Sequence, residues 1–451
     1  MTKLRQELSA YGLTMIVIGT LIGSGIYLTP SQIAGHLSSP YTILLVWCVG
    51  GVIALAGAFT FAELGSMFPK TGGVYVYLRE AYGPLAGFLF GWISFTIVMT
   101  GIVAALAIAC TNYLSFIFPL SSTAKSMVAV SLIVILTLIN IFRVKVAEIF
   151  TNIFSGLKLI SISFVILAGL IWGSADMFKQ SVESTVTRGS SLSVLSAFGL
   201  ALIGVLWSYG GWQHVTYLSG EAKNPQRSVP VAIVVGVLVV IAVYMLTNVS
   251  YMHLLTVQEI IQTDSVAADA ISTLFPFGGI VIAVIIILSV FATTFIYILT
   301  TPRIYFAMAQ DGLFFKSMAK VHPKHHTPVN AIIIQSLWAM VIILVWGTFE
   351  AVITYVVFIG WTFIMLTATT VIIFRVKRPE APRPYKTIGY PLTPIVFILA
   401  LFLFVVNTLI RNPFQAGVGL TLMLLGLPFY AYFKRKQKAK EPQLEPVEVK
   451  A

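Results

Sequence analysis

Residues 16–30 read IVIGTLIGSGIYLTP and decide how the chain folds, because they place Gly23, Ser24 and Gly25 in the middle of an apolar run of membrane length. A glycine inside a helix costs about 1 kcal/mol relative to alanine. In lipid, a backbone amide released by a helix break must be buried in protein or line a cavity. We therefore predict a broken helix beside a cavity.

The second half of this segment indicates what the cavity holds. A half-helix that starts at Ile26 would direct its N-terminal amides and the positive end of its dipole at the gap, which favours an anion. Close helix packing is the alternative interpretation, because Gly19 and Gly23 form a small-xxx-small pattern. The sequence alone leaves both interpretations open at this point.

The composition of the chain excludes a soluble globular protein. Of 451 residues, 58% are hydrophobic and only 10% are charged, whereas soluble domains carry about 25% charged residues. The chain is therefore predicted to be an all-α polytopic membrane protein. At about 20 apolar residues per crossing, we count twelve transmembrane segments, near residues 10–35, 41–66, 84–111, 124–142, 147–172, 192–219, 230–254, 277–309, 329–347, 351–374, 392–410 and 415–433.

The net charge of +12 is explained by orientation in the bilayer and gives no reason to expect a nucleic acid partner. With the N-terminus in the cytoplasm, 23 of the 28 basic residues fall in regions on the inner side, and four fall in outer loops. This bias predicts that both termini are cytoplasmic. The basic regions would then face anionic lipids of the inner leaflet.

A second interruption, WSYGGW at residues 207–212, lies in the sixth segment. Glycine-interrupted segments at corresponding places of two halves mark the midplane site of a transporter. We expect one transporter domain over 1–433. It would comprise inverted repeats near 10–172 and 192–374, two extra helices over 392–433, and a charged cytoplasmic tail at 434–451.

Lys158 lies within the fifth segment, about ten residues or roughly 15 Å from its cytoplasmic end. A lysine at this depth costs about 2.5 to 3.5 kcal/mol on insertion scales. We expect its ammonium to replace a bound cation by donating to carbonyls of the opened first segment and to the hydroxyl of Thr293 or Thr294. A snorkelling side chain and a proton-coupling role are the alternatives.

Other polar or aromatic residues have plainer interpretations. Trp207 could gate the site or simply pack. Glu63 fits a structural hydrogen-bond partner better than a substrate ligand. Cys48 and Cys110 lie in apolar runs and offer neither a disulfide framework nor a metal motif. The sequence contains no motif for catalysis, so we expect neither an enzyme nor a cofactor.

These features together resemble the amino acid, polyamine and organocation (APC) superfamily and, within it, the L-type amino acid transporter family. The resemblance runs over most of the chain. It is carried by the deep Lys158, Arg303 and the motifs IGSGIY at 22–27, AELG at 62–65, PKTGGVYVYLREAYG at 69–83, WSYGGW at 207–212, EAKNP at 221–225 and DGL at 311–313.

The resemblance implies a fold of two inverted five-helix repeats in which helices 1 and 6 are discontinuous and hold an amino acid. By position, the carboxylate of the substrate would meet backbone amides around Ser24 and Gly25. The implied substrate-binding residues are Leu21, Gly23, Ser24, Gly25, Ile26, Trp207, Ser208, Gly210 and Gln213, with carbonyls near Leu21, Trp207, Ser208 and Gly210 receiving the amino group.

The resemblance also implies how transport is coupled. Lys158 matches a buried family lysine that stands where sodium-dependent relatives bind an ion, which implies sodium independence. Tyr244 resembles a tyrosine linked to exchange, and Trp207 falls at the position of the gating aromatic. The implied coupling and gating residues are Lys158, Trp207, Tyr244, Thr293 and Thr294.

Two departures from the family pattern matter. Phe295 replaces an asparagine that many members carry, so their substrate preference does not transfer to this chain. Eukaryotic members join a heavy chain through a cysteine in the loop between segments three and four, and the loop around residues 119–126 has no cysteine. We therefore expect a stand-alone bacterial carrier.

We conclude from the sequence that the chain is a plasma-membrane carrier that exchanges neutral L-amino acids by alternating access without sodium. A proton-coupled amino acid symporter is the alternative transport mechanism. A channel or a non-transporting receptor is a further alternative, but a channel would need a continuous polar path, and the sequence offers one polar midplane locus.

Overall fold

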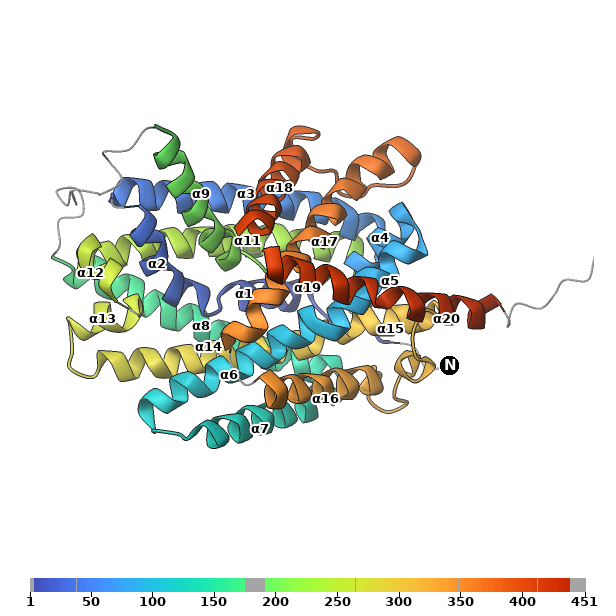
Figure 1. Cartoon of the computed structure of the whole chain (residues 1–451), viewed down its shortest axis with the longest axis horizontal. Coiled ribbons are helices and arrows are strands. Elements are labelled where there is room, and N and C mark those ends of the chain that lie inside the picture. The colour runs from blue at the N-terminus through green and yellow to red at the C-terminus, as the bar shows by residue number, and fades with distance from the viewer. Residues whose placement is uncertain are drawn as a thin grey trace, which may run out of the picture.

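The computed structural model describes residues 4–37, 39–174, 191–263, 265–346, 349–411 and 413–438. Among those residues the chain forms a bundle of helices that run mostly along one direction (Figure 1). Extended structure within the described ranges is confined to one isolated backbone pairing between Leu8 and Ala222. The prediction of an all-α polytopic membrane protein is confirmed.

Each of the twelve predicted segments coincides with a helix or with a helix that is interrupted. In order they are α1 (Ala10–Leu21) with α2 (Gly25–His36), α3 (Pro40–Met67), α5 (Pro84–Ile93) with η1 (Ser94–Val98) and α6 (Met99–Ile117), α7 (Ser122–Ile141), α8 (Val144–Trp172), α9 (Ser191–Ser208) with α10 (His214–Tyr217), α11 (Pro225–Leu254), α14 (Gly278–Thr300) with α15 (Pro302–Gln310), α16 (Val329–Trp346), α17 (Phe349–Lys377), α18 (Leu392–Arg411), and α19 (Pro413–Leu424) with α20 (Gly426–Lys438).

Short helices occupy the connections: α4 (Val74–Tyr82), η2 (Ser219–Glu221), α12 (Val257–Gln262), α13 (Val266–Ser272) and η3 (Lys316–Ala319). Within the described residues, nine helical spans are long and apolar enough to cross a membrane, and α1 with α2 makes a tenth that is bent by 41°. Helices α9 and α16 are also apolar but shorter over the part that is described. Helix α20 continues to Lys438, so the first five residues of the predicted tail are helical, and 439–451 lie outside the described residues.

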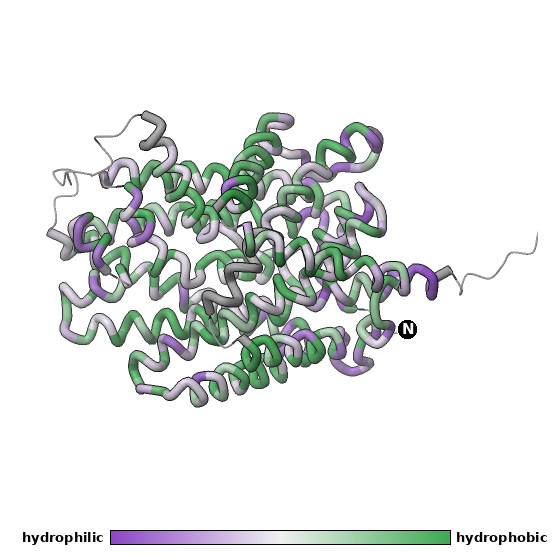
Figure 2. The backbone as a smooth tube through the Cα atoms, in the orientation of Figure 1, coloured by the Kyte–Doolittle hydropathy of each residue, from purple (hydrophilic) through white to green (hydrophobic). Residues whose placement is uncertain are grey.

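The outer surface of the bundle is apolar because it faces lipid. Helix α8 exposes Ile160, Leu167 and Ile171 on one side and buries Lys158 and Ile162 on the other. Figure 2 shows the same pattern for the whole bundle, with hydrophobic residues along the helices and hydrophilic residues gathered toward the loops. The polar interior of α8 therefore faces protein, not lipid.

The first segment lies in the centre of the bundle (Figure 1). Helix α1 packs against α8, α11 and α14, and α2 packs against α9. Helix α1 begins at an N-cap, Ser9, whose hydroxyl accepts from the amide of Gly12 at 3.0 Å. The central helix is thus enclosed by three long helices, and its interruption opens into protein.

Ion pairs gather at the end of the bundle that carries the predicted cytoplasmic loops. Glu63 binds Arg375 and Arg383, and the fully buried Glu221 binds the equally buried Arg303 through two hydrogen bonds of 2.8 and 3.1 Å. Glu63 is therefore a structural partner of basic side chains, as its position suggested.

The chain before α1 is tied to the end of the sixth segment by backbone hydrogen bonds. The amide of Leu8 donates to the carbonyl of Glu221 at 3.0 Å, and the amide of Lys223 donates to the carbonyl of Leu8 at 2.8 Å. Leu8 is fully buried. This pairing joins the two interrupted segments at the predicted cytoplasmic end.

Candidate functional site

The first segment breaks where the glycine motif lies. Helix α1 ends at Leu21, Ile22 is its C-cap, and α2 begins at Gly25. The first four amides of a helix have no partner within that helix. The amides of Tyr27 and Leu28 donate to the carbonyl of the N-cap, Ser24, at 3.2 Å, so the amides that face the break for a ligand are those of Gly25 and Ile26.

The sixth segment breaks between Ser208 and His214. Gly211 has a φ of +122°, which only glycine adopts readily. A methyl group added to Gly211 would lie 3.1 Å from Cβ of Thr20, so the two segments approach closely here. Likewise, a Cβ on Gly25 would lie 2.8 Å from Oγ of Ser208. The two breaks face each other, and glycine permits the approach on both sides.

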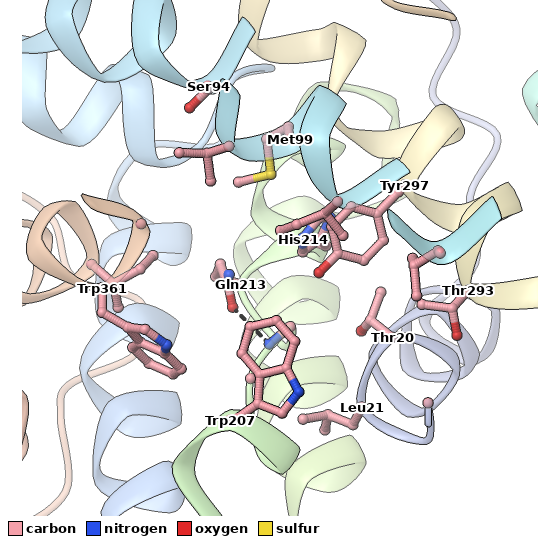
Figure 3. Close-up of a pocket in the computed structure, with 18 of the residues that line it drawn as sticks. Thr20, Leu21, Ser94, Met99, Trp207, Gln213, His214, Thr293, Tyr297 and Trp361 are labelled. Atoms are coloured by element: carbon pink, nitrogen blue, oxygen red, sulfur yellow. Dashed lines mark hydrogen bonds between the residues drawn. The ribbon is translucent and has the colours of Figure 1, made fainter. Parts of the chain in front are cut away.

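A cavity of about 120 Å³ lies between the breaks (Figure 3). Its lining comes from α1, α2, α9 and α10, with further walls from η1 and α6, from α14 and from α17. Polar groups and large apolar side chains both contribute. The lining includes Thr20, Leu21, Gly23, Ser24, Gly25, Ser94, Met99, Trp207, Ser208, Gly210, Gln213, His214, Thr293, Tyr297 and Trp361.

Lys158 holds the carbonyls that the break in the first segment releases. Its Nζ donates to the carbonyl of Gly19 at 2.7 Å, to the carbonyl of Ile22 at 2.8 Å and to Oγ1 of Thr293 at 2.7 Å. An ammonium has three donors, so these contacts use all of them. Thr294, the other hydroxyl proposed for this contact, instead donates to the carbonyl of Val290 in its own helix.

Tyr244 connects the two broken segments. Its hydroxyl lies 2.6 Å from the carbonyl of Leu21 and 3.2 Å from the carbonyl of Ser208. A phenol has one proton, so it can donate to only one of these carbonyls at a time. Each carbonyl oxygen has two lone pairs. The carbonyl of Leu21 also accepts from the amide of Gly23 at 2.8 Å, so Gly23 and Tyr244 together occupy it, and the carbonyl of Ser208 keeps acceptor capacity for the amino group of a ligand.

Most of the predicted substrate-binding residues line the cavity: Leu21, Gly23, Ser24, Gly25, Trp207, Ser208, Gly210 and Gln213. Ile26 is the exception, because its side chain is fully buried and it is not among the lining residues of the described chain. Of the predicted coupling and gating residues, Trp207 and Thr293 line the cavity. Lys158 and Tyr244 are not among the described lining residues, but they form hydrogen bonds with the backbone of the broken segments. Phe295 is buried away from it against Phe150, with ring centroids 4.1 Å apart.

The sequence did not predict several residues that line the cavity from the third, eighth and tenth segments. Ser94, Met99, Tyr297 and Trp361 come from the third, eighth and tenth segments, and only the fold brings them to the breaks. His214 was also missed, although it follows Gln213 directly in the sequence. One further signal appears only in the backbone: η1 is a turn of π-helix, a feature that is frequent at functional sites.

Comparisons with known proteins find similarity over nearly the whole chain. Residues 8–429 match the family model described as amino acid permease. The chain is 32% identical over 440 residues to the serine/threonine exchanger SteT of Bacillus subtilis (strain 168), covering 97% of this chain and 98% of that protein. It is 31% identical to the human b(0,+)-type amino acid transporter 1, with 96% and 88% covered. It is 29% identical to the human large neutral amino acids transporter small subunit 2, with 96% and 82% covered.

Proposed function

The chain belongs to the amino acid permease family of the APC superfamily, and on that premise we propose that it exchanges neutral L-amino acids across a membrane without sodium. The resemblance to L-type transporters found in the sequence is confirmed, and the family and relatives are transporters, not enzymes. The relatives, an exchanger and two amino acid transporters by name, support the substrate class and the mode of transport.

One observation carries the proposal: the two helix breaks face each other across a single cavity. The start of α2 offers amides, which suit a carboxylate, and the end of α9 offers the carbonyl of Ser208, which suits an ammonium. An α-amino acid carries both groups on one carbon. A zwitterion placed between the breaks would satisfy both sets with backbone atoms, whatever its side chain.

Sodium independence is supported by the contacts of Lys158. Its ammonium already places a positive charge against the carbonyls of Gly19 and Ile22 and the hydroxyl of Thr293. These oxygens are the kind of ligands that a sodium ion would take in the same place. A second cation there would meet like-charge repulsion.

Counterflow tests the proposal. Purified protein in liposomes loaded with labelled amino acid should release it only when unlabelled amino acid is present outside. Replacing external sodium by choline should leave the rate unchanged. Efflux that does not depend on external amino acid would contradict exchange, and a requirement for sodium would contradict the role given to Lys158.

Proton-coupled symport is the second candidate, because Lys158 is a buried titratable group beside the site. In that mechanism, an imposed pH gradient would drive net uptake into empty liposomes. An exchanger shows no such net uptake, so one preparation separates the two candidates.

We further propose that the protein works alone in the plasma membrane with both termini in the cytoplasm. The basic residues at one end of the bundle support the orientation. The described connection between α6 and α7 contains no cysteine, and both cysteines of the chain lie inside helices, Cys48 in α3 and Cys110 in α6. The chain thus lacks the thiol that a disulfide to a heavy chain would need in this loop.

A further inference from the structure

The wall of the cavity carries two polar side-chain atoms without partners. Ser94 and His214 both line it, and the Oγ of Ser94 and the Nε2 of His214 are buried without a hydrogen bond in the described structure. A buried polar atom without a partner costs about 1 to 3 kcal/mol, and such atoms are few in native proteins. The described residues include 14 such side-chain atoms, and these two are the ones whose residues line the cavity, where a ligand could supply the missing partner.

The hydrogen-bond pattern defines what His214 can bind. Its Nδ1 lies 2.7 Å from Oγ1 of Thr300, and that hydroxyl donates its proton to the carbonyl of Ile296 at 2.8 Å. The hydroxyl can therefore only accept from His214, which places a proton on Nδ1. His214 is fully buried, where a charged ring would be costly, so Nε2 carries a lone pair and acts as an acceptor.

The ring of His214 is held in place by its neighbours. Its centroid lies 4.2 Å from that of Tyr297 and 5.2 Å from that of Tyr217. Figure 3 shows His214 beside Tyr297 on the wall of the cavity. The bond to Thr300 fixes the remaining rotation, so Nε2 keeps one position and presents a fixed acceptor.

We propose that His214 is a specificity-determining residue whose Nε2 accepts a hydrogen bond from the side chain of the substrate. The favoured substrates are neutral amino acids with a hydroxyl or carboxamide group, in preference to apolar amino acids of the same shape. This inference rests on the proposed function, since it assigns the α-carboxylate and α-amino groups to the backbone of the helix breaks and the side chain to the part of the wall that carries His214.

The apolar part of the same wall strengthens the selection. Met99 and Trp361 surround the space that a substrate side chain would enter, so water competes poorly there for the substrate's donor. An apolar side chain of equal size would leave Nε2 unpaired. The site would then discriminate through one hydrogen bond and not through size.

Threonine and valine provide the matched test because they have the same shape and differ by a hydroxyl group. In counterflow with wild-type protein, threonine should compete about tenfold more strongly than valine, the factor expected for one net hydrogen bond. The ratio is measured on one preparation, so it does not depend on the fraction of active protein. Equal competition by the two amino acids would overturn the proposal while exchange itself stood.

Two variants assign the effect to a residue. His214→Asn keeps a donor for Thr300 but has no group at the position of Nε2, so the ratio should fall close to one, mainly through weaker threonine competition. Ser94→Ala should keep most of the preference. A ratio that persists in His214→Asn, or that is lost in Ser94→Ala alone, would overturn the assignment to His214. Absence of counterflow with all twenty amino acids in wild-type protein would instead overturn the proposed function, and this inference with it.

Discussion

At Lys158, a positive charge in the membrane interior is balanced by three oxygens. Insertion of a lysine at the bilayer centre costs about 2.5 to 3.5 kcal/mol, and a hydrogen bond to a charged group contributes about 1.5 to 3 kcal/mol. Two of its partners, the carbonyls of Gly19 and Ile22, lose their helical partners where α1 ends. The lysine and the break therefore stabilise each other.

Replacing Lys158 by alanine should strongly reduce exchange, because the carbonyls of Gly19 and Ile22 lose their charged donor. Within the described chain, these carbonyls then keep only hydroxyl contacts from Thr293 and Ser289. Counterflow in liposomes measures the effect. Thr293→Val should also reduce exchange, whereas Thr294→Val should leave it near the wild-type rate. Of the two threonines, it is Thr293 that contacts the ammonium of Lys158, while Thr294 donates to a carbonyl in its own helix. Unchanged kinetics in Lys158→Ala would remove the lysine from the mechanism.

Gly25 and Gly23 lie at the same helix break but differ in the space around them, so each provides a control for substitution of the other. A Cβ at Gly25 would lie 2.8 Å from Oγ and 3.1 Å from Cα of Ser208, whereas at Gly23 the nearest atom is 3.9 Å away. Gly25→Val should abolish substrate binding and Gly25→Ala should weaken it severely, while Gly23→Ala should be tolerated. Scintillation proximity measures the affinities, and a Gly25→Val protein that binds like the wild type would contradict the placement of the carboxylate.

The sequence predicted the backbone part of the site better than the side-chain part. Gly23, Ser24 and Gly25 are recognisable because glycine in a membrane helix has a strong local effect. Tyr297 and Trp361 have no comparable sequence signal, since aromatic residues are common in apolar helices and only the packing of the fold brings these two to the cavity. Ile26 was predicted from the motif, as the residue where the second half-helix starts; its side chain is buried and is not among the described lining residues, so a contact through its backbone amide stays a prediction.

Among the helices, the ends at the predicted cytoplasmic side are fixed by buried charge pairs. Glu221 in η2 and Arg303 in α15 are both fully buried and form two hydrogen bonds. Such a pair contributes little net stability compared with apolar residues, but loss of one partner leaves a buried charge. The pair therefore fixes where the sixth and eighth segments meet.

Glu221→Gln should destabilise the protein by about 3 to 5 kcal/mol, the usual effect of removing one partner from a buried pair. Thermal unfolding of the purified protein in detergent provides the measurement. Glu7→Gln serves as the control, because Glu7 pairs with Arg5 at 3.7 Å on the surface, where ion pairs contribute little. Equal melting temperatures for Glu221→Gln and wild type would show that the pair is not structurally required.

Helix boundaries were predictable to within a few residues where glycine, proline or charge marks them. The third segment was harder: it was predicted to end at residue 111, but α6 continues to Ile117. The π-helical turn η1 within it was not predicted, because nothing in its sequence, Ser94–Val98, differs from ordinary helix. The end of α20 was missed for another reason, since basic residues at 434–438 read equally well as a solvated tail or a last helical turn.

For the whole molecule, the distribution of basic residues predicts the orientation, and the division into inverted repeats over 10–172 and 192–374 remains a prediction. In a protein with Cys48→Ala and Cys110→Ala, a Thr123→Cys change should react with a membrane-impermeant maleimide in intact cells. Lys324→Cys should react only after permeabilisation. Both positions are exposed in the structure, so the reverse result would place the termini outside.

The pairing of Leu8 with Glu221 and Lys223 uses main-chain atoms alone. Its two hydrogen bonds do not depend on which side chains those positions carry, so ordinary substitutions cannot tune them. Any motion that separates the start of the first segment from the end of the sixth must break both bonds together, whichever amino acid is bound. Substitutions in the cavity can then change substrate preference while the energy needed to break these two hydrogen bonds stays the same. Proline at position 8 or 223 would lower that energy in a single step, because it removes an amide donor.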